Sequence, residues 1–102
     1  MATWKHKPQE CPGDYWFDGK AVMTRGVADA LTPDEILAIT TKLKAFIQEE
    51  NGADYLQVFE ADDGRCVWCI DQLRRAVKES GEFTPQQLEE YDVWTMLLPE
   101  EY

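Results

Sequence analysis

The spacing of apolar residues predicts one long helix near the middle of the chain. Over residues 36–47 apolar side chains recur every three or four positions, which places them on one face of a helix. The string TPDE at residues 32–35 forms a capping box with proline at the first helical position. Asn51-Gly52 supplies a left-handed stop. We therefore predict a helix over residues 33–50.

Four segments have the β-branched and aromatic composition of strands: residues 20–27 (KAVMTRGV), 54–60 (DYLQVFE), 65–70 (RCVWCI) and 93–98 (VWTMLL). Asp63-Gly64 suits a two-residue hairpin turn, so the second and third segments should pair antiparallel. Phe59 would then face Trp68 on one side of the ribbon. Val58 would face Cys69 on the other. Because both faces carry apolar groups, we expect the sheet to be covered at least partly on both sides.

Outside these segments the chain predicts irregular structure and short helices. Residues 1–19 mix aromatic residues with proline and glycine without a period, which indicates an irregular N-terminal arm. Asp71 can cap a short helix that ends near Ser80-Gly81, and a second capping box at residues 84–87 starts another. Residues 99–102 form an acidic tail.

These elements predict an α+β fold. A chain of 102 residues has room for one hydrophobic core, so residues 1–102 are expected to form a single domain. Because each amphipathic element must bury one face, we expect one main helix packed on a small, mainly antiparallel sheet of three to four strands, with short C-terminal helices. Gly26 is expected to mark a bulge or the end of the first strand.

The charge of the chain predicts the kind of partner it meets. Twenty acidic side chains against ten basic ones give a formal net charge of -10. Such a field repels nucleic acids and anionic lipid surfaces and favours encounter with basic proteins. We therefore expect a basic protein partner and neither direct nucleic-acid binding nor membrane binding. The sequence leaves the oligomeric state open, because an edge strand at residues 93–98 could also pair between two copies.

Local concentrations of carboxylates are the candidate partner-binding residues: Glu49, Glu50, Asp54, Asp62 and Asp63. If they share one surface, spaced carboxylates could imitate phosphates and inhibit a DNA-handling protein. The alternative is a solvated surface that keeps the protein soluble.

The cysteines bear on compartment and on metal binding. Cys11, Cys66 and Cys69 are odd in number, so they cannot form a complete disulfide framework. With no apolar run of membrane-spanning length, this predicts a cytoplasmic protein. Cys66 and Cys69 form a CxxC motif, and His6 with Cys11 would complete a four-ligand zinc set. Residues three apart on a strand point to opposite faces, so we expect buried thiols, an exposed His6 and no cofactor.

No motif in the sequence indicates a catalytic site. The chain has no Walker loop, no dinucleotide fingerprint and no serine-centred elbow. The first hypothesis is therefore a non-enzymatic interaction module. The alternatives are a metal- or thiol-dependent protein that uses Cys66 and Cys69, and an enzyme whose site is assembled from dispersed residues.

Two strings carry a family resemblance. The segments VMTRGV at residues 22–27 and DYLQVFE at residues 54–60 resemble the TRGV and DYLQVFE strings of small proteins from Firmicutes and their mobile elements, the family called domain of unknown function 960. The resemblance covers residues 20–60, and the chain departs from the pattern beyond Ala61. It implies a cytoplasmic bacterial protein of mobile-element origin and supplies no activity or catalytic residues.

Overall fold

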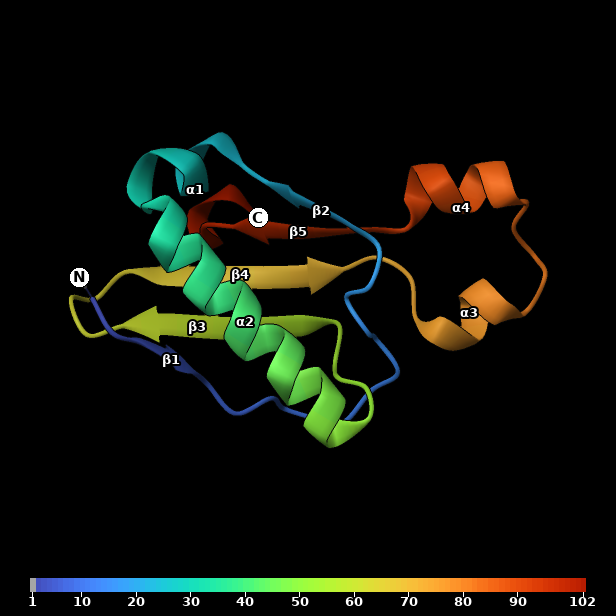
Figure 1. Cartoon of the computed structure of the whole chain (residues 1–102), viewed down its shortest axis with the longest axis horizontal. Coiled ribbons are helices and arrows are strands. Elements are labelled where there is room, and N and C mark those ends of the chain that lie inside the picture. The colour runs from blue at the N-terminus through green and yellow to red at the C-terminus, as the bar shows by residue number, and fades with distance from the viewer. Residues whose placement is uncertain (1) are drawn as a thin grey trace.

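The chain folds into a five-stranded sheet with one long helix across it (Figure 1). A computed structural model describes residues 2–102, so Met1, the first residue of the predicted arm, lies outside the described residues. In chain order the elements are β1 (Trp4–His6), β2 (Lys20–Met23), α1 (Arg25–Ala30), α2 (Pro33–Glu50), β3 (Leu56–Ala61), β4 (Cys66–Asp71), α3 (Arg75–Glu79), α4 (Pro85–Tyr91), β5 (Val93–Leu97) and the 3-10 turn η1 (Pro99–Glu101).

The sheet has the strand order β1-β3-β4-β5-β2. Every neighbouring pair is antiparallel except β2 and β5, which run parallel. The α+β class is therefore confirmed, whereas the sheet is mixed and has five strands in place of three to four. The additional strand, β1, lies in the segment predicted to be irregular, where Trp4 pairs with Ala61. A strand of three residues is too short to show the two-residue alternation of a strand. The strand β1 is therefore defined only by its pairing with β3, which lies far away in the sequence.

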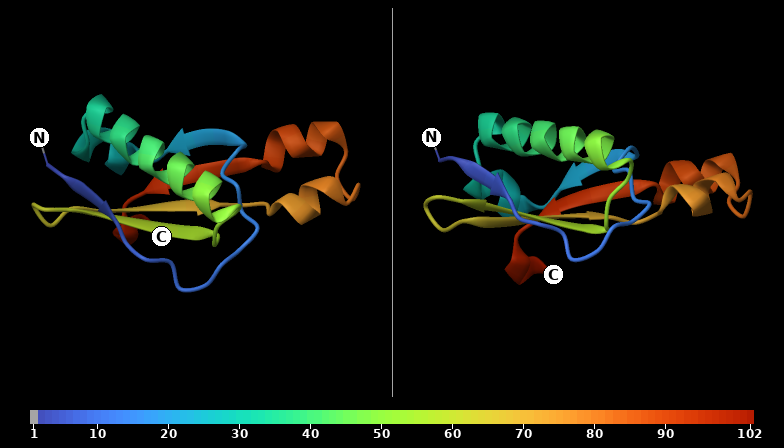
Figure 2. Two further views of the ribbon diagram at one scale, coloured as in Figure 1. Left: turned by 60° about the horizontal axis from the view of Figure 1, so that its bottom comes forward. Right: turned by 90° about the horizontal axis from the view of Figure 1, so that it is seen from below.

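The helix α2 has the predicted bounds and covers one face of the sheet (Figure 2). Both hydrogen bonds of its capping box are present, and Asn51 ends it in the left-handed conformation with φ 57°. Its buried residues Ile39, Leu43 and Ile47 belong to the core. No long helix covers the opposite face in the part of the chain that the structure describes; η1 lies there instead. The ring of Tyr102 meets Trp68 with its centroid 5.6 Å away.

The segment predicted as one strand over residues 20–27 divides at Thr24. The strand β2 stops at Met23, and Thr24 caps the short helix α1 by accepting a hydrogen bond from the Val27 N–H. Gly26 lies inside this helix, so its prediction as a bulge or as the end of the strand is wrong. A Cβ at Gly26 would come within 2.7 Å of the Glu101 carboxylate, which also accepts from the Thr24 hydroxyl at 2.6 Å. The acidic tail is thus folded against the start of α1.

The β3–β4 hairpin is antiparallel as predicted, but its register differs by one residue. The Ala61 N–H donates to the Arg65 carbonyl at 2.8 Å, which leaves a three-residue loop. Gly64 takes the left-handed position of that loop with φ 93°, a conformation that glycine adopts without strain. Val58 therefore faces Trp68, and the predicted pairs of Phe59 with Trp68 and of Val58 with Cys69 are wrong.

The two short C-terminal helices extend beyond the end of the sheet (Figure 1). Asp71 is the last residue of β4 and caps neither of them, because α3 begins only at Arg75. The helix α4 begins at the second predicted capping box, with both of its hydrogen bonds present. Neither helix contains a buried residue. The strand β5 forms where it was expected but lies inside the sheet, since β2 covers its outer side.

Candidate functional site

The strand β2 presents an unused backbone edge. Within residues 2–102 it pairs only with β5. The Lys20 N–H donates to the Asp92 carbonyl at 2.9 Å, and the Thr24 N–H donates to the Met96 carbonyl at 3.0 Å. Because backbone groups alternate between the two sides of a strand, Ala21 and Met23 direct their N–H and C=O groups away from β5. All four residues of β2 are exposed, so these groups are open to a further strand.

An apolar groove lies beside this edge. A hollow of about 410 Å³ opens between the end of β2, α1 and α2, and it is lined by Met23, Ala28, Leu31, Pro33, Ile36, Leu37 and Thr40. A smaller hollow of about 60 Å³ shares Met23, Ile36 and Thr40 with it and reaches Ala21, Val22, Trp94 and Met96. We call the two together the β2–α2 groove. Leu37 at 64% and Met23 at 48% are among the most exposed large apolar side chains of the described chain.

The groove exists because α2 has two apolar faces. Ile39, Leu43 and Ile47 form the buried one. Ile36, Leu37 and Thr40 follow at helical spacing on the side that faces β2. The sequence indicates this second face through Leu37. This apolar residue does not belong to the series over residues 36–47 whose three- and four-residue spacing predicts the buried face.

The opposite edge of the sheet is less suited to strand addition. The strand β1 has three residues, and Lys5 in it and Lys7 just after it carry charges. Lys7 pairs with Glu60 at 3.5 Å. Short, lysine-bearing edges discourage the addition of another strand. The free edge of β2 combines Ala21, Val22 and Met23 with the single charge of Lys20.

A buried carboxylate fixes α2 where the groove begins. Glu35, in the first turn of α2, accepts hydrogen bonds from the Thr32 N–H at 3.0 Å and the Trp4 indole at 3.1 Å. Arg65 donates to both of its oxygens, at 3.2 and 2.6 Å. The bonds from Arg65 and then from Thr32 lower the pKa of Glu35 to about 2. Glu35 therefore joins α2, as an anion, to β1 and to the residue that precedes β4.

At the other end of the groove, two ionisable groups hold the backbone of Phe17. Lys44 donates to the Phe17 carbonyl and lies 5.5 Å from the centroid of the Trp94 ring. Asp71 accepts from the Phe17 N–H at 2.8 Å. Burial lowers the pKa of Lys44 and raises that of Asp71. Both groups are engaged with the main chain of a residue whose φ is 50°, so they stabilise a strained connection to β2.

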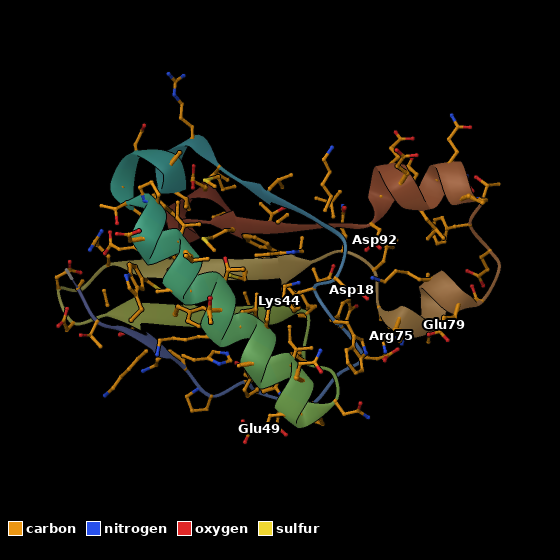
Figure 3. All side chains as sticks on the ribbon, in the orientation of Figure 1. Asp18, Lys44, Glu49, Arg75, Glu79 and Asp92 are labelled. Atoms are coloured by element: carbon orange, nitrogen blue, oxygen red, sulfur yellow. The ribbon has the colours of Figure 1, made fainter. Side chains whose placement is uncertain are left out.

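The five predicted acidic residues do not form one surface. Glu49 and Glu50 end α2, and Asp54 precedes β3. Asp62 and Asp63 lie in the hairpin loop at the other end of β3. This strand has six residues and spans about 20 Å, so it separates Asp54 from the loop. Figure 3 shows Glu49 at the far end of α2, away from that loop. An imitation of closely spaced phosphates by all five carboxylates therefore has no support in this geometry.

Several of these carboxylates have structural partners. Asp63 pairs with Arg65 at 2.8 Å, and Asp62 accepts from the Thr3 N–H at 3.3 Å. Asp54 accepts from its neighbour Tyr55 at 2.9 Å. These bonds hold the hairpin loop and the start of β3, so among the described residues only Glu49 and Glu50 of the predicted set are exposed without an ion pair or a side-chain hydrogen bond.

The four predicted metal ligands are dispersed. Cys66 and Cys69 lie on opposite faces of β4, and burial raises the pKa of Cys69 to about 12. Cys11 is exposed, with its sulfur 3.6 Å from an Asp54 oxygen. Within residues 2–102 no three histidine, cysteine, aspartate or glutamate side chains are grouped as metal ligands. The predicted zinc set is therefore not assembled.

His6 is not the exposed residue that its lysine neighbours suggested. Its ring stacks on Phe59 with the centroids 4.5 Å apart and meets Phe46 edge-on at 4.4 Å. The Nε2 atom lies 2.7 Å from the Gln57 side-chain oxygen. Burial lowers the pKa of His6. Sequence reasoning missed this position because it depends on the pairing of β1 with β3.

Comparisons of the chain with models of protein families, with curated proteins and with solved structures find no match. The resemblance to the domain of unknown function 960 family therefore stays a prediction. Among the helices formed by residues 2–102, none has both the length and the apolar character that crossing a membrane requires.

Proposed function

We propose that this chain is a non-enzymatic interaction module that binds an extended segment of a basic partner protein by adding it as a further strand beside β2. The observation that carries the proposal is the free edge of β2 lying next to the apolar β2–α2 groove. Strand addition of this kind uses backbone hydrogen bonds for affinity and pockets for alternate side chains for selection.

The backbone of β2 supports an extended ligand. Ala21 and Met23 each offer one N–H and one C=O. Every second residue of an added strand can exchange backbone hydrogen bonds with these groups. Alternate side chains of that strand then enter the groove between β2 and α2. An edge of four residues gives a small interface, which fits a transient, moderately tight complex.

The charge supports a basic partner. The chain carries a net charge of -10, so a second copy of itself is repelled and a positively charged protein is attracted. Proteins that handle DNA are one such class, because they carry lysine and arginine for phosphate contacts. With the family resemblance, this supports a cytoplasmic module of mobile-element origin that acts on such a protein.

The test compares partner capture by three forms of the chain from lysate of a bacterial host, with elution in salt steps. Ala21→Pro removes an N–H that points away from β5, while Ala21→Ser at the same position keeps it. We expect the wild type and Ala21→Ser to retain a basic protein that leaves as salt rises, and Ala21→Pro to lose it. Equal retention by Ala21→Pro, with an unchanged circular dichroism spectrum, would contradict docking at β2.

A further inference from the structure

We infer that the β2–α2 groove selects a partner segment in which a large apolar residue is followed, two positions later, by a small one. This inference rests on the proposed strand addition and specifies its ligand. It is carried by the unequal size of the two hollows beside the edge, about 410 Å³ and about 60 Å³.

The two hollows match the repeat of an added strand. Side chains two residues apart on a strand point to the same face and lie about 7 Å apart. Ala21 and Met23 of β2 have this relation, and both line the small hollow together with residues of α2. The large hollow includes Met23 with Leu31 and Leu37, and the small one also reaches Ala21.

The relative position of the hollows sets the order of the two partner residues. Antiparallel pairing is more stable than parallel pairing and more common. An antiparallel segment passes Met23 first and Ala21 second, so its large residue is N-terminal to its small one. The large residue enters the hollow that includes Leu37, while the small residue fits the hollow above Trp94.

The residue between them points to the other face. There it lies beside Val22, which is 38% exposed, so a polar residue is accepted. The net charge of -10 favours a partner segment that is basic overall, which is represented by one lysine at each end. The expected ligand is thus a short extended stretch of the form basic, polar, large apolar, polar, small, polar, basic.

Two peptides of identical composition test the order. We would titrate the ¹⁵N-labelled protein with the blocked peptides K-S-F-S-A-S-K and K-S-A-S-F-S-K and follow its amide signals by NMR. The first should shift the amides of Ala21 and Met23 and bind at least about tenfold more tightly than the second, as expected when one large apolar side chain loses its hollow. Equal affinities would overturn the inferred order.

A variant pair tests the large hollow itself. Ala28→Trp fills that hollow from an exposed position on α1, and Ala45→Trp adds the same side chain at an exposed position of α2 outside the groove. We expect Ala28→Trp to lower the affinity for the first peptide at least about tenfold, and Ala45→Trp to leave that affinity unchanged. Unchanged binding by a folded Ala28→Trp variant would overturn the assignment of the hollow.

Titration of the Ala21→Pro variant with both peptides, together with selection from a randomised peptide display library, separates this inference from the proposed function. If both peptides bind equally and Ala21→Pro abolishes both, strand addition holds and the inferred selection fails. If peptides from a randomised display library bind the wild type and Ala21→Pro equally well, strand addition at β2 fails, and the inference fails with it. A library consensus of large followed by small apolar residues, lost on Ala21→Pro, supports both.

Discussion

The carboxylate of Asp14 caps the distant helix α3, because it accepts the N–H of Ala76, 62 residues later in the chain, at 2.7 Å. The residue at the N-cap position of α3, Arg74, makes no side-chain cap of its own. Arg75 lies over the Trp16 ring, 3.6 Å from its centroid, and adds a second link between the N-terminal arm and α3. Figure 3 shows Arg75 on α3 close to Asp18 of the arm. The arm thus holds α3 at the end of the sheet.

Removing that cap should loosen α3 without unfolding the sheet. Asp14→Ala leaves the Ala76 N–H without its acceptor, a loss of about 1 kcal/mol for a helix cap. We expect faster hydrogen exchange at residues 75–79, measured by NMR, and unchanged exchange in β3 and β4. Glu89→Ala, at an exposed position on α4, is the control. Unchanged protection of α3 in Asp14→Ala would show that the cap contributes nothing.

The ionised Glu35 should make the protein sensitive to acid. Its pKa is lowered from 4.5 to about 2 in the folded state, so the unfolded state binds the proton first as the pH falls. This contribution to stability is complete above pH 4.5 and is lost as the pH falls toward 2. Glu35→Gln should therefore be less stable than the wild type at pH 7, and the difference should shrink below pH 4.5.

Urea unfolding midpoints at pH 7, 4 and 2.5 measure this difference. The exposed Glu49→Gln variant is the matched control, because it removes the same charge without a buried partner. A Glu35→Gln variant that is as stable as the wild type at pH 7 would mean that the bonds from Arg65 and Trp4 to the ionised carboxylate do not stabilise the fold.

His6 should add a second pH dependence at higher pH. Burial between two aromatic rings lowers its pKa below 6.5, so the folded state favours the neutral ring. Its contribution to stability is present above pH 6.5 and is lost as the pH falls through the lowered pKa. Because the chain has one histidine, its NMR titration is unambiguous. A measured pKa at or above 6.5 would contradict the buried site.

The three thiols should react in an order set by their burial. Cys11 is exposed, Cys66 is half-buried and Cys69 is buried. We expect iodoacetamide, followed by mass spectrometry, to label Cys11 first and Cys69 only under unfolding conditions, because the pKa of Cys69 is raised to about 12. Prompt labelling of Cys69 in the folded protein would place this residue outside the core.

Adjacent proline substitutions should distinguish the two sides of β2. Val22 directs its N–H toward β5, whereas Ala21 directs its own away. Val22→Pro should lower the free energy of unfolding by about 1–3 kcal/mol, since it removes a ladder bond and leaves a carbonyl without its partner. Ala21→Pro should have a smaller effect. Thermal unfolding that ranks the two variants in the opposite order would overturn the assignment of the free edge.

Local signals determined part of this fold from the sequence by itself. The bounds of α2, the capping box of α4, the existence of the β3–β4 hairpin and the strand β5 all follow from residues close together in the chain. Caps, turns and apolar periods involve hydrogen bonds and packing within a few positions, so their residues predict them directly.

Only the tertiary structure decided the rest. The strand β1, the parallel pairing of β2 with β5 and the cap of α3 by Asp14 each join segments far apart in the sequence. The groove depends on the same long-range pairing, because Leu37 faces β2 only once β2 has docked beside β5. A strand of three or four residues is too short to show a hydrophobic period, and it forms only when it pairs with another strand. Neighbouring residues in the sequence therefore predict neither the strand nor the site beside it.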